Sequence, residues 1–320
     1  MAIVYFAPAT DKAIGGVKVI YQHAALLAEQ GVEACVFHPE QPDFTCSWFD
    51  HGAEIKRDTA FNLKDDFFVV PDVWAGTTGL QCMAKRMHFG IFVQNGYLLS
   101  EGRMSDGYDS LSRAYEAADV ILSISDDTTE MIRLAFPQLP SEKIMRVQLS
   151  IGPAFRNRRR GNKQKLLSYM PRRLPQHSKL LRFFLRPYLP QGWQFAAIDG
   201  AHEAEVAAAL SASSVFLSFS SLEGVGLPPL EAALSGNVVV GYTGEAGKEY
   251  FRPPLFRAVD SGDLKTFVQQ TRAAIDFIES GKADSAAFED DIVRLDDMFS
   301  RGREAERLLA FANSIRIPRK

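Results

Sequence analysis

The chain has 320 residues, of which 46% are hydrophobic and 23% charged, and its formal net charge is −3. This length is sufficient for two globular domains with separate cores, and the small net charge argues against a nucleic-acid-binding protein. Only three cysteines occur, without CxxC spacing, so neither a disulfide framework nor a thiolate metal site is indicated.

The first 155 residues repeat a short apolar segment followed by a helical pattern. The first predicted helix places Val17, Ile20, Ala24 and Leu27 on one face and ends at Gly31. Alternation of this kind predicts a parallel sheet covered by helices on both faces. The predicted strands of this part are AIVYFAP, VEACVFH, DDFFVVP, RMHFGIFVQ and ADVILSIS.

A cationic stretch follows near residue 150. It has two interpretations: an exposed connection between domains, or a contact with an anionic membrane surface or a lipid-linked acceptor. The cationic residues are Arg156, Arg158, Arg159, Arg160, Lys163 and Lys165.

A second series of strands and helices occupies residues 156–300, and the end of the chain is mostly helical. We therefore predict an α/β protein with two Rossmann-like domains, 1–155 and 156–300, and a helical tail over 301–320 that packs back on the first domain. The predicted strands of the second domain are KLLSYM, WQFAAID, SSVFLSFS and NVVVGYTG.

No window approaches the roughly 18 consecutive apolar residues that a membrane span needs. The start MAIVYFAPATDK lacks the basic and long apolar regions of a signal peptide. We expect a cytoplasmic protein, at most peripheral at the inner face of the membrane.

The segment SLEGVGLPPLEAALSG follows the apolar run SSVFLSFS and contains two glutamates. Pro228 can begin a helix that Gly236 ends, and a glycine-rich turn before a helix exposes amides suited to phosphate. Glu231, in the first helical turn, could accept hydrogen bonds from a ribose, and Glu223 from a second sugar. The simpler interpretation is that Glu231 only favours the helix dipole and Glu223 is solvated.

This segment resembles the E-x7-E signature of retaining GT-B glycosyltransferases of family four. GGVKVIYQHAALLAEQG, AADVILSISDDTTEMI and VVVGYTGEAGKEYF also resemble that family, so the similarity extends over most of residues 1–260. The resemblance implies a GT-B fold, with two parallel sheets facing across a cleft. It also implies that Glu231 binds the nucleotide ribose and that Glu223 contacts the transferred sugar. The donor is then met by the amides of Gly224, Val225, Gly226 and Leu227.

The family usually supplies an Arg-x4-Lys pair to the donor diphosphate, and this chain departs from that spacing. In SYMPRRLPQHSK, Arg172 and Arg173 stand where the arginine is expected, and Lys179 is one place late counted from Arg173. The resemblance implies catalytic roles for Arg173 and Lys179 and a donor contact for Arg172. An arginine fork suits phosphate oxygens, whereas the alternative is a solvated loop.

The acceptor side is predicted from the opening Gly15-Gly16 loop and from Gln94 and Asn95. These amides stand where many relatives place a histidine, so no base titrating near neutrality is expected there.

The predicted function is a retaining transfer of a sugar from a nucleotide sugar to an acceptor hydroxyl, in bacterial cell-surface polysaccharide or glycoconjugate synthesis. Same-face substitution is expected, in which the leaving phosphate helps take the acceptor proton, without a metal or other cofactor. Two alternatives remain: a catalytically weak glycan- or nucleotide-binding scaffold, and a nucleotide-sugar epimerase on the same fold. A nicotinamide dehydrogenase is disfavoured because APATDKAIGG contains no GxGxxG.

Overall fold

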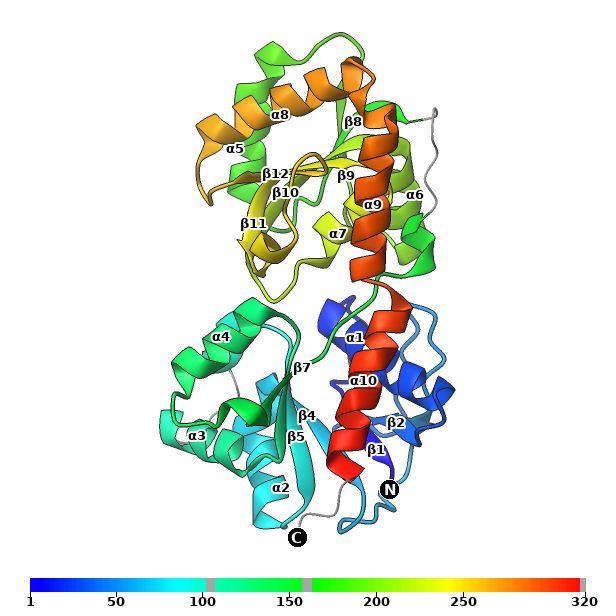
Figure 1. The fold of residues 1–320 in the computed structure, drawn as a ribbon, viewed down its shortest axis with the longest axis vertical. Helices are drawn as coiled ribbons and strands as arrows, with labels where there is room; N and C mark the ends of the chain where they lie inside the picture. The colour runs from blue at the N-terminus through cyan, green and yellow to red at the C-terminus, as the bar shows by residue number, and fades with distance from the viewer. Residues whose placement is uncertain (102–106, 157–162, 317–320) are drawn as a thin grey trace. The chain divides into compact units, whose positions relative to one another are not determined.

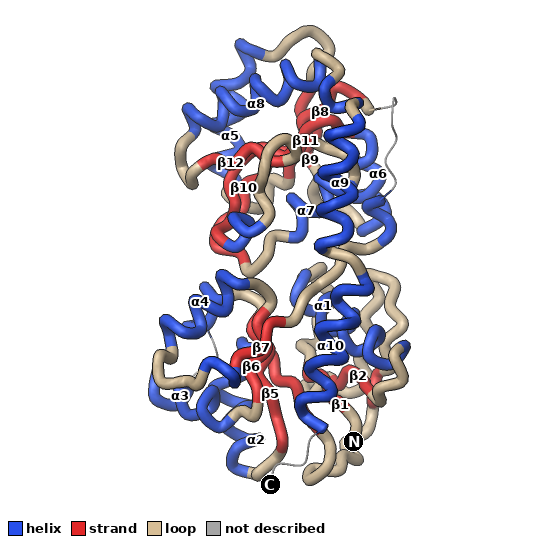
Figure 2. The backbone as a smooth tube through the Cα atoms, in the orientation of Figure 1, coloured by secondary structure: helices blue, strands red, loops and turns tan. Residues whose placement is uncertain are grey.

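The computed structural model describes residues 1–101, 107–156 and 163–316. The chain forms two compact units, one of Met1–Leu149 with the segment from Arg301 onward, and the other of Ser150–Ser300. The chain leaves the first unit after Leu149, a few residues before the boundary at 155 expected from the sequence (Figures 1 and 2).

The first unit is built on a seven-stranded sheet in which all paired strands are parallel. Its strand order is β3-β2-β1-β4-β5-β6-β7. The two edge strands, β3 and β7, were not predicted, because each is very short and half-buried and so lacks an apolar run. The strands are β1 (Ile3–Phe6), β2 (Ala34–Phe37), β3 (Ile55–Lys56), β4 (Phe67–Pro71), β5 (His88–Val93), β6 (Val120–Ser123) and β7 (Ile144–Arg146).

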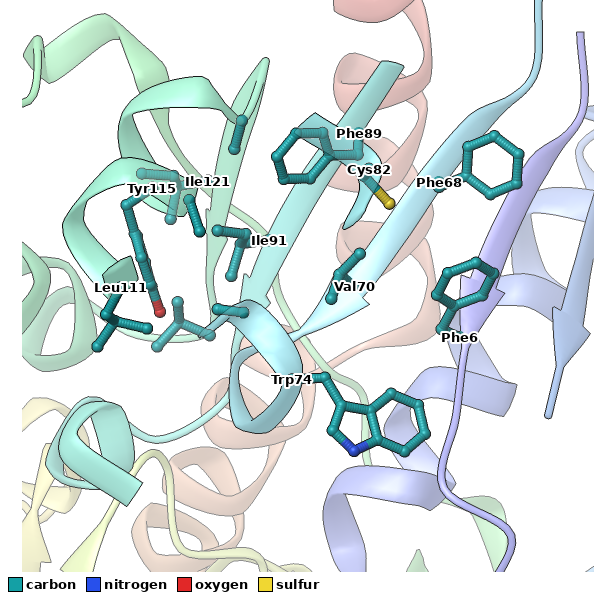
Figure 3. Close-up of a cluster of buried hydrophobic side chains, with 14 of the residues drawn as sticks. Phe6, Phe68, Val70, Trp74, Cys82, Phe89, Ile91, Leu111, Tyr115 and Ile121 are labelled. Atoms are coloured by element: carbon teal, nitrogen blue, oxygen red, sulfur yellow. The ribbon is translucent and has the colours of Figure 1, made fainter. Parts of the chain in front are cut away.

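Helices cover this sheet, and one face of the core is shown in Figure 3. Phe68 and Val70 of β4 and Ile91 of β5 point to the same side, where they pack with Leu111 and Tyr115 of a covering helix. The helices are α1 (Gly15–Glu29), α2 (Leu80–Ala84), α3 (Tyr108–Ala117), α4 (Asp126–Ala135) and α10 (Arg301–Arg316). The 3₁₀ segments are η1 (Asp72–Trp74), η3 (Gly96–Glu101) and η4 (Ser141–Lys143), and η2 (Ala75–Gly79) is a π-helix.

The terminal helix α10 packs on α1 of this first unit. Gln22 donates from Nε2 to Glu304 Oε2 at 2.7 Å, and Arg301 pairs with Glu29. His23 is fully buried, its Nε2 donates to the carbonyl of Gln148 at 3.1 Å, and burial lowers its pKa to about 4. The buried imidazole thus links α1 to the segment after β7, and Glu304 Oε1 of α10 lies 3.5 Å from the same nitrogen.

The second unit is built on a five-stranded parallel sheet in the order β12-β11-β10-β8-β9. The edge strand β12 was not predicted from the sequence, and only its two ends are buried. The strands are β8 (Gln164–Tyr169), β9 (Gln194–Ala197), β10 (Ser213–Glu223), β11 (Val238–Glu245) and β12 (Phe256–Val259). The helices are α5 (Pro175–Leu185), α6 (Glu203–Ala212), α7 (Leu227–Leu234), α8 (Leu264–Glu279) and α9 (Ala286–Met298), with 3₁₀ segments η5 (Pro153–Arg156), η6 (Arg186–Tyr188), η7 (Ala246–Glu249) and η8 (Lys282–Asp284).

Two glycines of β11 allow β10 to approach closely, and the second of them, Gly244, lies where the pairing register shifts between Ser220 and Glu223. Gly241 has φ +135°, and a Cβ there would lie 2.2 Å from the Ser218 carbonyl oxygen. Gly244 has φ +66°, and a Cβ there would lie 2.6 Å from the carbonyl oxygen of Ser221. Only glycine fits either position, and the resulting irregularity sets where Glu223 lies at the carboxyl end of β10.

Candidate active site

The carboxyl ends of β8 and β10 bring an arginine and a glutamate together. β8 and β10 are neighbours in the sheet, and Arg173 follows β8 while Glu223 ends β10. Arg173 Nη2 lies 3.2 Å from Glu223 Oε1, and the side chains are 63% and 19% exposed. A mostly exposed guanidinium thus faces a mostly buried carboxylate at the edge where parallel sheets bind ligands.

Two opposing effects act on the Glu223 carboxyl. Burial raises its pKa, because the charged form loses solvation, and the positive charge of Arg173 lowers it. Burial is the larger effect, so the pKa is raised overall. Arg173 therefore offsets part of the cost of burying this charge.

The turn after Glu223 is held by a buried tyrosine that the sequence analysis did not identify. Gly226 has φ +84°, and the hydroxyl of Tyr250 donates to the carbonyls of Val225 at 2.8 Å and Gly226 at 3.0 Å. In a trans peptide unit the C=O and N–H point in opposite directions. The amides of Gly226 and Leu227 therefore point away from the Tyr250 ring.

The helix that follows offers fewer amide donors to a phosphate than its glycine-rich start predicts. α7 begins at Leu227, and prolines occupy its second and third positions, where they supply no N–H. The amides available to an anion are thus concentrated in the turn before the helix, at Gly226 and Leu227, and not in its first turn.

Glu231 lies in the second turn of α7, and the prediction that it lies in the first turn is wrong. The helix begins at Leu227, one residue before the predicted start at Pro228, so Glu231 is its fifth residue and no acidic residue occupies the first turn. Favourable interaction with the helix dipole fades beyond that turn, which weakens the interpretation of Glu231 as a dipole partner. Its side chain is half-buried.

The other two cationic candidates are exposed. Arg172 lies beside Arg173 in the turn before α5, and Lys179 lies one turn into α5. Among the described ion pairs, Arg173 is the residue that contacts Glu223, so the roles of Arg172 and Lys179 stay predictions.

The predicted acceptor-side residues of the first unit also lie together. Gln94 donates from Nε2 to the carbonyl of Gly16 at 3.1 Å, and Asn95 accepts from the amide of Tyr97 at 3.0 Å. A Cβ at Gly16 would lie 3.2 Å from Gln94 Oε1, so the close approach favours glycine. Gly15 is the first residue of α1.

A buried carboxyl that was not predicted holds this group in place. Asp72, directly after β4, accepts from the amides of Val73 at 2.9 Å and Gln94 at 3.3 Å. It joins the carboxyl ends of β4 and β5, and the only signal in the sequence is an acidic residue immediately after a strand.

The described residues contain no cluster of three or more His, Cys, Asp or Glu side chains that could hold a metal ion. Metal independence itself stays a prediction. No helix of the described ranges is long and apolar enough to span a bilayer.

No protein-family model matches the chain. Solved structures of similar fold include HepE of Anabaena in complex with UDP-glucose, with a TM-score of 0.69 and 12% identity over 98% of this chain and 100% of HepE. The lipopolysaccharide outer core galactosyltransferase WaaB has a TM-score of 0.65 and 16% identity over 98% of this chain and 99% of WaaB. The chain has the GT-B fold.

The similarity to known sequences is shorter. A curated alpha-1,6-glucosyltransferase of Actinobacillus pleuropneumoniae serotype 7 is 33% identical over 91 residues, which are 28% of this chain and 28% of that protein. The chain covers 55% of the length of TarM, a larger protein of similar fold, with a TM-score of 0.60 and 11% identity. The prediction of two parallel α/β domains of GT-B type is confirmed.

Removing the Tyr250 hydroxyl should destabilise the turn at Val225 and Gly226. We expect Tyr250→Phe to lower the free energy of unfolding by about 1–3 kcal/mol, because two carbonyls lose their buried donor. Nucleoside diphosphate binding should weaken as well. Calorimetry and chemical denaturation test this against Tyr242→Phe, whose hydroxyl contacts His177 Nδ1 at 3.0 Å. Equal loss of ligand affinity in the two variants would contradict the role of Tyr250.

Asp72 should make stability depend on pH in the first unit. Burial raises its pKa from 3.8 to about 6, so between these values the folded state binds more protons than the unfolded state. Its contribution to stability is therefore greatest below pH 4 and falls, by about 3 kcal/mol in total, as pH rises through 6. Denaturation from pH 4 to 7 should show this slope in the wild type and not in Asp72→Asn. Parallel curves would contradict it.

Proposed function

We propose that the chain is a retaining glycosyltransferase that moves a sugar from a nucleotide-sugar donor to an acceptor hydroxyl. The observation that carries the proposal is the Arg173–Glu223 pair beside the turn at Gly226 and Leu227. A cationic fork, backbone amides at a glycine turn and a carboxylate are the groups that a sugar diphosphate requires.

In this proposal the donor lies at the carboxyl edge of the second sheet. Arg173 and the amides of Gly226 and Leu227 bind the diphosphate, and Glu231 accepts hydrogen bonds from the ribose. One Nη atom of Arg173 faces Glu223, so its other N–H groups remain available to phosphate oxygens. Arg172 and Lys179 are both exposed, and they add positive charge where the diphosphate reaches Arg173.

The chemical step needs stabilisation of the leaving diphosphate and correct placement of the sugar. Negative charge grows on the diphosphate as the glycosidic bond breaks, and a guanidinium fixed beside it lowers the barrier. Glu223 accepts hydrogen bonds from hydroxyls of the sugar. Its negative charge stabilises the positive charge that develops at the anomeric carbon of the sugar. The acceptor hydroxyl attacks from the face that the phosphate leaves, and its proton passes to the phosphate oxygen.

Because these groups supply the charge that a divalent cation would supply, we propose that turnover needs no metal and persists in excess chelator. Gly16, Gln94 and Asn95 are proposed to bind the acceptor. A solved structure named as a lipopolysaccharide outer core galactosyltransferase and a protein named as an alpha-1,6-glucosyltransferase support a role in cell-surface polysaccharide or glycoconjugate synthesis.

Donor binding tests this assignment through Glu231. Glu231→Gln keeps the shape of the side chain but removes the charge that strengthens a hydrogen bond to ribose. We expect the affinity for UDP or UDP-glucose, the first ligands to titrate, to fall by about 1.5–3 kcal/mol. Glu279→Gln, which removes a carboxylate paired with Lys165 in the same unit, is the matched control. Unchanged binding in Glu231→Gln, with a ligand that the wild type binds, would contradict the ribose contact.

A further inference from the structure

Three aromatic side chains of α5 and η6 are largely exposed to solvent in the described structure. Phe183 is 72% exposed, Phe184 is 48% exposed, and Tyr188 of η6 is 52% exposed. The rings of Phe183 and Phe184 lie 5.3 Å apart in an edge-to-face arrangement. Three large rings exposed within six residues are unusual for a surface helix, because each leaves apolar area in water.

Arginines surround these rings. Arg182 and Arg186 are exposed on the same helix and its 3₁₀ extension, and Arg272 of the adjacent helix α8 lies with its guanidinium 4.5 Å from the Tyr188 ring centre. Among the described residues none of these three arginines forms a salt bridge, but Arg182 Nη1 donates to the Tyr169 hydroxyl at 2.7 Å and is occupied within its own unit. We call the other five residues the α5 patch: Phe183, Phe184, Arg186, Tyr188 and Arg272.

Acidic residues are scarce around the α5 patch. The sequence contains no Asp or Glu between Glu142 and Asp199, a segment that includes all of β8 and α5. The nearest acids along α8 are Asp276, one turn after Arg272, and Glu279, which pairs with Lys165. The patch therefore combines exposed rings with an excess of positive charge.

We propose that the α5 patch docks on an anionic membrane surface. Arginines meet the phosphate headgroups, the Phe183 and Phe184 rings enter the interface between headgroups and acyl chains, and Tyr188 lies at headgroup depth. Exposed aromatic residues flanked by cations are the combination that binds such interfaces, because apolar burial and electrostatic attraction add. The patch shares no residue with the proposed donor site, although Lys179 lies one turn before Phe183 on the same helix, and binding to it needs neither donor nor turnover.

The α5 patch is a stronger candidate for membrane contact than the described cations of the stretch 156–165. Arg156 pairs with Asp296 at 2.7 Å, Lys163 Nζ donates to three carbonyls, including that of Ser213 at 2.7 Å, and Lys165 pairs with Glu279. These three cations are occupied within their own unit. Arg158, Arg159 and Arg160 lie outside the described residues.

Vesicle co-sedimentation tests the proposal, with phosphatidylglycerol–phosphatidylcholine vesicles at low salt and phosphatidylcholine vesicles as the neutral reference. The double variant Phe183→Ser/Arg186→Gln should bind the anionic vesicles at least about 10-fold more weakly than the wild type, since one interfacial cation alone contributes about fivefold. The matched control is Val293→Ser/Arg294→Gln on α9, which also removes one exposed apolar residue and one cation. It should bind like the wild type.

A second measurement places the contact directly. The three native cysteines are buried, so an environment-sensitive thiol probe on Phe183→Cys reports this position. Its emission should shift to the blue and intensify with anionic vesicles, and the same probe on Val293→Cys should not respond. The proposal is overturned if the wild type does not bind anionic vesicles, if it binds soluble heparin but no vesicles, or if both double variants lose binding equally.

Discussion

Replacing Arg173 by alanine should lower turnover by about 10²–10³-fold and should also weaken nucleoside diphosphate binding. Both effects follow from one cause, because the charge that the guanidinium meets exists on the bound diphosphate and grows as it leaves. Arg173 is largely exposed and contacts Glu223 through one Nη atom, so the substitution should not disturb the fold. Steady-state kinetics and calorimetry on the same preparation measure the two losses.

Arg294→Ala is the matched control for this variant, since it removes an exposed arginine that pairs with a carboxylate in the same unit. It should retain both turnover and ligand affinity. Loss of affinity without loss of turnover in Arg173→Ala would restrict the guanidinium to ground-state binding.

Replacing Glu223 by alanine should lower turnover by a similar factor, about 10²-fold or more, but leave nucleoside diphosphate binding intact or slightly tighter. The carboxylate acts on the reacting sugar, which a nucleoside diphosphate lacks, and its removal releases Arg173 for phosphate. Glu279→Ala, a surface carboxylate paired with Lys165, is the control. Weaker diphosphate binding in Glu223→Ala would mean that the Arg173–Glu223 pair organises the phosphate site and does not compete with it.

The pH dependence of the Glu223 variants sharpens this test. Burial raises the pKa of Glu223, and we propose that the ionised carboxylate is the active form. Turnover of the wild type should therefore fall on acidification at a higher pH than an ordinary glutamate would give. The residual turnover of Glu223→Gln should lack that limb.

The parts of the fold that the sequence predicts are those with a local signal. Strands β10 and β11 are continuous apolar runs, and Pro228 with Gly236 marks the extent of α7 correctly to within a residue. The edge strands β3, β7 and β12 have no such run, whereas the edge strand β9, also partly exposed, was predicted from WQFAAID. The prediction for Glu231 was wrong because the helix begins at Leu227, one residue before Pro228, which makes Glu231 its fifth residue.

The residues of the candidate site also fall into those with a local sequence signal and those without one. Glu223 and Glu231 are visible because a motif places them within one segment. Tyr250 and Asp72 act on partners about 25 and 22 positions away, Val225 and Gln94, and such pairs form only when strands come together in the folded chain. Their role could not be predicted from local pattern, since a tyrosine in a loop and an aspartate after a strand are both common on surfaces.

The most direct test of the proposed function is release of nucleoside diphosphate with and without acceptor. A nucleotide sugar shown to bind by thermal shift is incubated with the wild type, Arg173→Ala and Glu223→Ala, and a panel of glycan and lipid-linked acceptors. A transferase predicts that one acceptor raises release by the wild type well above its acceptor-free rate, while both variants stay near background. If the wild type, with a bound donor and the full panel, releases no more than either variant, the site binds a ligand without catalysing transfer.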